Sequence, residues 1–276
     1  MAMKKEAALK AHEAKPWIRR FGRFGHMAKG TVYALVGLLA LLSAAGMGGG
    51  TTGTSGALST VADEPFGQLL LWLIGIGLIG YVIWELLKSI KDVEHNGTDA
   101  KGIIKRISYI VSAFIYGSLA LTAIKLAMHA GSSGSSEQTI SAKLLAQPFG
   151  QWIVGLIGLI IIGYGCSQLY RGWKEKFMKH FKIYEMNEKE IRLARSAGRV
   201  GLAARGVVLI IVGFFFIETA ITANPNESKG LGGALAELAS QPFGQLLLAI
   251  TAAGLVLYGV YEMIRGRYQR MNFGRK

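Results

Sequence analysis

Ionisable side chains inside long apolar stretches are the residues of this sequence best placed to do chemistry. Lys29 stands at the start of the first stretch and Glu85 near the end of the second, and Arg205 and Glu262 hold the same two places further along the chain. A charge inside a membrane is costly unless it is paired. We therefore expect two structural ion pairs, Lys29–Glu85 and Arg205–Glu262, in preference to a proton relay.

Three glutamines and three tyrosines recur at fixed places in the same stretches. Each glutamine ends a Pro-Phe-Gly-Gln string, and each tyrosine follows the proline of that string by sixteen residues. They are Gln68, Gln151 and Gln245, and Tyr81, Tyr164 and Tyr258. The glutamines are expected to bond the loop of their own hairpin or a ligand. The tyrosines either join packed helices by hydrogen bonds or form a polar ring around a central axis.

Two further charges, Lys125 and Glu218, lie in apolar stretches but have no charged counterpart elsewhere. They could bond to each other between helices, or Lys125 could extend to the membrane surface. The alternative is a charge that faces solute in an outer vestibule.

Metal, cofactor and catalytic sites are not predicted. The five histidines are scattered, without the spacing of metal ligands. The glycines at 75–80 match a dinucleotide fingerprint, but they lie inside an apolar stretch with no preceding strand. No nucleophile with a neighbouring base can be nominated, so we do not expect an enzyme.

The elements that carry these residues are long apolar segments. Apolar residues make up 51% of the 276-residue chain and charged residues only 17%, against about 25% in soluble domains. Six blocks approach the ~20 residues that cross a bilayer. They span about 30–47, 66–87, 107–128, 149–170, 202–222 and 243–264. The sequence predicts an all-α polytopic membrane protein with six transmembrane helices.

Positive charge lies on alternate connections between these blocks. All but three of the 31 Lys and Arg residues fall in 1–29, 88–106, 171–205 and 265–276. This positive-inside pattern predicts that both termini are cytoplasmic. It also accounts for the net charge of +14 without nucleic acid as a partner.

The blocks form three copies of one hairpin. Pro-Phe-Gly-Gln begins the second, fourth and sixth blocks, and a cation follows each proline by twenty-three residues: Lys88, Arg171 and Arg265. The middle copy diverges, with Tyr109 and Gln168 at the places of Lys29 and Glu85. Three hairpins of the same orientation predict a pseudo-threefold bundle.

The repeats set the expected boundaries. Hairpins cover 21–92, 101–172 and 197–268, between a basic segment 1–20 and a tail 269–276, and an amphipathic basic link covers 173–196. The aromatic residues of the link and of the N-terminal segment have helical spacing, which predicts helices on anionic lipid at the cytoplasmic face. Docking of a cytoplasmic protein is the lesser alternative.

The repeated motifs resemble those of a known family. Gly-Arg-x-Gly-x-x-x-Lys/Arg-Gly at 22–30 and 198–206, Gly-Ala-Leu at 56–58 and 233–235, and Pro-Phe-Gly-Gln are similar to the bacterial membrane family DUF1206. The resemblance covers the chain from about residue 17 onward and implies a plasma-membrane protein of three tandem two-helix units. It implies no activity.

Two functions of different classes fit the sequence. The first is a non-enzymatic accessory, assembly or scaffold protein with membrane or cytoplasmic protein partners. The second is a small ion or solute channel or permease along the pseudo-threefold axis.

Overall fold

The computed structural model describes residues 2–93, 97–129 and 136–270, and these form nine α-helices. The six long helices are α1 (Ala2–Ala44), α3 (Gly67–Lys91), α4 (Ala100–Ala127), α6 (Gly150–Trp173), α7 (Glu188–Thr222) and α9 (Gly244–Tyr268). Each contains a segment long and apolar enough to cross a membrane. The predicted all-α fold with six spans is confirmed.

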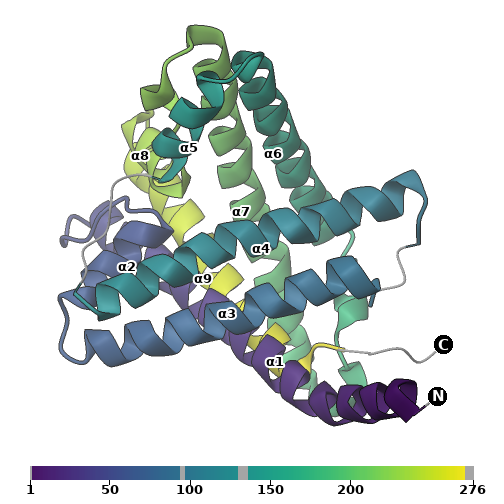
Figure 1. The fold of residues 1–276 in the computed structure, drawn as a ribbon. Coiled ribbons are helices and arrows are strands. Elements are labelled where there is room, and N and C mark those ends of the chain that lie inside the picture. Colours follow the sequence, from purple (N-terminus) through teal and green to yellow (C-terminus); the bar gives the residue numbers. More distant parts are fainter. Residues whose placement is uncertain (1, 94–96, 130–135, 271–276) are drawn as a thin grey trace.

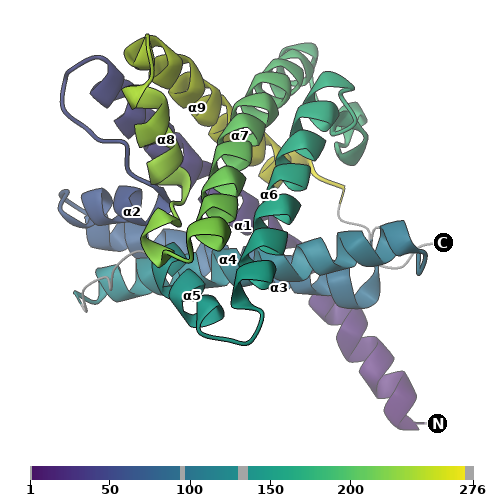
Figure 2. The ribbon, with the colours of Figure 1, turned by 90° about the horizontal axis from the view of Figure 1, so that it is seen from above.

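The long helices associate in pairs that join successive copies (Figures 1 and 2). The most extensive contacts are α1 with α9, α4 with α3, and α7 with α6. The first long helix of each copy therefore packs along the second long helix of the preceding copy, and copy one packs on copy three. This cyclic order closes the three hairpins into a ring.

Small residues permit the close approach within these pairs. A Cβ added to Gly30 would lie 2.6 Å from the carbonyl oxygen of Gly259, and one added to Gly206 would lie 2.9 Å from that of Gly165. Without a hydrophobic force between helices in lipid, such backbone contact is a main source of association.

The first long helix of the middle copy is shifted by three residues from the alignment that its glycines suggested. The residue equivalent to Gly37 and Gly213 is Ala120, three residues after Gly117. Gly37 approaches Ala252 and Gly213 approaches Gly158, whereas Gly75 faces Ala120, and not Gly117. By the same register the counterpart of Lys29 and Arg205 is Ser112, so the assignment to Tyr109 was wrong. Gly117 meets only a side chain of α3.

The hairpin of the middle copy is splayed. Within copies one and three, α1 packs on α3 and α7 on α9, but α4 and α6 share almost no contact in the described part of the chain. A Cβ on Gly25 would lie 2.4 Å from the backbone nitrogen of Tyr81, and one on Gly201 would lie 2.5 Å from that of Tyr258. The middle copy has Ser108 at this place, so the same close contact is sterically excluded.

Three short helices precede the second long helix of each copy and were not predicted. They are α2 (Thr54–Ala62), α5 (Ser136–Leu145) and α8 (Leu231–Ser240). Their Gly-, Ser- and Thr-rich sequences suggested loops. Each copy therefore consists of a long helix, a short helix and a second long helix. The short helices lie at the end of the bundle opposite to the C-terminal ends of α3, α6 and α9 (Figure 1).

The first two residues of each Pro-Phe-Gly-Gln, the proline and the phenylalanine, form a turn that precedes the helix. The helix begins at the glycine of each motif. In copies one and two its N–H donates to the carbonyl three residues earlier, from Gly67 to Glu64 and from Gly150 to Gln147, both at 2.9 Å. The phenylalanines are left-handed, with φ of 63°, 61° and 60° at Phe66, Phe149 and Phe243. This conformation costs a bulky residue about 1–2 kcal/mol.

The link 173–196 is not the predicted surface helix. It contains two 3₁₀ turns, η1 (Met178–His180) and η2 (Ile183–Glu185), and α7 begins only at Glu188. Phe177 and Phe181 are fully buried against Tyr261, with ring centroids 5.4 and 5.9 Å away. Their spacing of four reflects packing into the bundle, since the backbone of Lys182 also donates to Tyr268 at the end of α9.

Candidate functional site

A polar cavity of about 80 Å³ lies where α3, α6 and α9 end, here called the cation-rich end of the bundle. All six long helices and η1 contribute to its wall. Its ionisable side chains include four cations and two carboxylates: Lys29, Lys88, Arg171 and Arg265, with Glu85 and Glu262. Three of the cations are the repeated ones that follow Pro-Phe-Gly-Gln.

Glu262 is the centre of the charge network. One carboxylate oxygen accepts from Lys29 Nζ at 3.2 Å and from the Tyr258 hydroxyl at 2.8 Å, and lies 3.6 Å from Arg265 Nη1. The other lies 2.7 Å from His26 Nδ1. The side chain is 1% exposed, so these contacts replace its hydration. His26 and its bond were not predicted.

The ion pairs differ from those predicted within each copy. Lys29 pairs with Glu262 of copy three, and Glu85 pairs with Lys88 on its own helix. The cyclic order of the helices is the reason, because α1 packs on α9 and not chiefly on α3. The helix that packs most extensively on α3 is α4, which has the uncharged Ser112 at the position equivalent to Lys29. The charge of Glu85 is therefore neutralised by Lys88 of its own helix.

Arg205 has tyrosine partners instead of Glu262. It lies on α7, which packs on α6, and α6 has the uncharged Gln168 at the corresponding place. Its Nε donates to the Tyr33 hydroxyl at 3.1 Å, and its guanidinium carbon lies 5.1 Å from the ring centre of Tyr258. Arg205 Nη1 is buried without a hydrogen-bond partner.

The three repeated tyrosines all line the cavity. Lys29 Nζ lies 4.9 Å from the ring centre of Tyr81 and 5.5 Å from that of Tyr258, while Arg205 stacks near Tyr164 at 5.6 Å. Two cations therefore connect the tyrosines of the three copies.

Two tyrosines that the sequence analysis did not single out complete this layer. Tyr116 donates to the Tyr33 hydroxyl at 3.2 Å, and both side chains are buried. They occupy equivalent places in the first helices of copies one and two, a repeat that is visible only in the corrected register.

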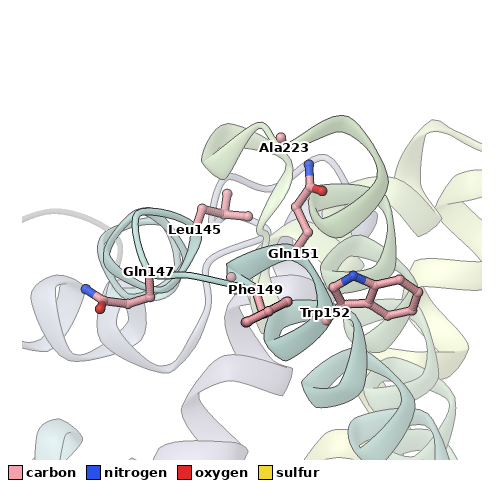
Figure 3. Close-up of a pocket in the computed structure, with 7 residues that line it drawn as sticks. Leu145, Gln147, Phe149, Gln151, Trp152 and Ala223 are labelled. Atoms are coloured by element: carbon pink, nitrogen blue, oxygen red, sulfur yellow. The ribbon is translucent and has the colours of Figure 1, made fainter.

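The glutamines lie far from these tyrosines, at the opposite end of the bundle, and all three are exposed. Gln68 lies 2.7 Å from His129 Nε2. Gln151 lines a shallow pocket of about 390 Å³ and extends toward Ala223 (Figure 3). Gln245 has no side-chain partner within the described residues.

The remaining candidates, Lys125 and Glu218, are both exposed, on α4 and α7. In the residues that the structure describes, no bond joins them. Among those residues there is likewise no group of three His, Cys, Asp or Glu side chains that could hold a metal ion.

Six apolar helices around a buried charge network define a multi-pass membrane protein built of three tandem repeats. The chain belongs to the family described as Domain of Unknown Function (DUF1206), which matches residues 24–92, 107–175 and 200–269. It is 48% identical over 261 residues to "Uncharacterized protein YxxB" of Bacillus subtilis (strain 168), covering 95% of this chain and 94% of that relative. No solved structure matches the chain.

Proposed function

We propose that this protein is a non-enzymatic accessory protein of the bacterial plasma membrane that holds another membrane component in the gap between α4 and α6. The cation-rich end faces the cytoplasm in this proposal, because Lys and Arg accumulate on cytoplasmic loops. The six apolar helices support the membrane assignment, and the relative from Bacillus subtilis supports a bacterial setting.

The splayed middle hairpin is the observation that carries the proposal. The buried share of the most apolar window of each span is 28% in α4 and 22% in α6. In the other four spans it is 44% or 50%. Val32 and Val208 are fully buried, whereas their counterpart Ile115 is 55% exposed. A surface that is sealed in two copies is open in the third.

A channel along the axis is the second candidate, and the polar cavity favours it. At the wall of the cavity, however, the buried rings of Tyr33, Tyr116 and Tyr258 pack together, and Lys29 and Arg205 place two cations among these rings. This packing favours the accessory role over conduction.

Site-specific photocrosslinking in the native membrane tests the proposal. We expect a photoreactive residue at Val111 or Ile160, both exposed toward the gap, to give one discrete adduct. The control position is Ile250 of α9, which is 63% exposed on a helix whose hairpin is closed. It should give only diffuse lipid labelling. Equal, diffuse labelling at all three positions would count against a specific occupant.

A further inference from the structure

The charge of the cavity wall is not balanced by the protein. Its two carboxylates are already paired, Glu85 with Lys88, and Glu262 with Lys29 and Arg265. Arg171 adds a further positive charge, and Arg205 stands just behind the wall. A buried excess of positive charge is stabilised by an anion from outside the chain.

The wall is lined from α4 by neutral hydroxyls. Ser108, Tyr109 and Ser112 reach the cavity there, and Ser112 takes the place that Lys29 and Arg205 hold in the other copies. A hydroxyl such as that of Ser112 can donate to an anion without the like-charge repulsion that a further cation would add, whereas the Ser108 hydroxyl already donates to the Lys105 carbonyl at 2.7 Å. Opposite them, α6 contributes Tyr164, Gln168 and Arg171.

The gap between the same two helices becomes apolar away from the cation-rich end. Val111 of α4 and Ile160 of α6 are 49% and 60% exposed. Their counterparts in copy one, Ala28 and Gly77, are buried in mutual contact, since a Cβ on Gly77 would lie 2.5 Å from the Ala28 Cβ. The open sides of α4 and α6 thus carry a basic, hydroxyl-lined cavity at one end and exposed apolar side chains further along, as an amphiphile requires.

We propose that a phospholipid with an anionic headgroup is the occupant, with its phosphate in the cavity near Arg171 and Lys88 and its acyl chains between α4 and α6. The exposed apolar residues Val111 and Ile160 distinguish this ligand from free phosphate, which would not contact them. The inference rests on the proposed function and names the membrane component that fills the gap at the cation-rich end.

Native mass spectrometry of the full chain in mild detergent tests the proposal. With dioleoylphosphatidylglycerol we expect one lipid retained at low micromolar concentration, and with dioleoylphosphatidylcholine at least about tenfold weaker retention, because charge-assisted hydrogen bonds are lost. Arg171→Gln should weaken retention of the anionic lipid about tenfold. The matched control, Lys174→Gln, removes an exposed cation one turn away and should leave retention unchanged.

Three outcomes would overturn the lipid assignment. They are equal retention of the two lipids by the wild-type chain, equal retention by the two variants, and thermal stabilisation by inorganic phosphate equal to that by the anionic lipid. The wild-type comparison decides even if Arg171→Gln does not fold. A discrete protein adduct at Val111 without lipid selectivity would refute this inference and leave the proposed function standing.

Discussion

At the scale of single residues, Glu262 is the side chain on which most depends. In the part of the chain that the structure describes, its carboxylate contacts the His26 ring and forms ion pairs with Lys29 and Arg265. Removing one member of a buried ion pair leaves a desolvated charge and costs about 3–5 kcal/mol. The protein therefore concentrates its electrostatic stability in one carboxylate of copy three.

We expect Glu262→Gln to destabilise the protein by about 3 kcal/mol or more, for this reason. Unfolding by sodium dodecyl sulfate in mixed micelles measures the change. Glu218→Gln removes an exposed acid from α7 and is the matched control, with an expected effect within about 0.5 kcal/mol. Adding Lys29→Met to Glu262→Gln should restore part of the loss. Similar losses for the two single variants would refute the role of Glu262.

At the scale of elements, the residues at three positions distinguish the open middle hairpin from the closed ones. Gly25 and Gly201 let the first and second long helices of their copies touch, while Ser108 adds a Cβ where no space exists in the other copies. Val111 and Ile160 replace the small residues Ala28 and Gly77 in the same interface. The middle hairpin therefore differs from the other two because larger residues replace small ones on α4 and α6.

Restoring the small residues should close the middle hairpin. We expect the triple variant Ser108→Gly, Val111→Ala and Ile160→Gly to shorten the distance between spin labels on the exposed Cys166 of α6 and on a cysteine introduced at Ile107 of α4. The same variant should lose its adduct in the gap. Gly25→Ser is the reciprocal control and should separate α1 from α3. An unchanged distance in the triple variant would show that other contacts hold the gap open.

The elements also show what the sequence could and could not predict. Apolar length and Lys/Arg placement were enough for the six spans, because the membrane imposes both. The paired appearance of Lys29 with Glu85 and of Arg205 with Glu262 drew attention to residues that line or adjoin the cavity. It did not identify the partners, because a repeat reveals equivalence and not which neighbouring copy each helix meets. Phe177 and Phe181 misled for a related reason, since a spacing of four fits a surface helix and a buried turn equally.

At the scale of the whole molecule, the ring of hairpins surrounds a filled axis. Tyrosine rings and two cations occupy the place where a pore would run, and the open surface lies at the side of the bundle. The proposed accessory role uses this lateral surface and does not require a path through the protein.

We therefore expect liposomes that contain the protein to leak K⁺ or Cl⁻ no faster than empty liposomes. Fluorescence flux measurements provide the comparison, and a Gln68→Ala, Gln151→Ala and Gln245→Ala variant should behave like the wild-type chain. Flux that the wild-type chain supports and that Tyr258→Ala alters would revive the channel.

The cyclic pairing of helices has a consequence for how the chain is made. α1 is synthesised first, but the partner for its Gly30 and Gly37 face is α9, the last long helix. Contacts between such distant segments are slow to form, because the intervening chain must first be ordered. During insertion the α1 face that packs on α9 therefore remains uncovered while α3, α4, α6 and α7 enter the bilayer. The ring of helices closes when α9 packs on α1. The molecule therefore attains its full stability only when the third repeat has been synthesised.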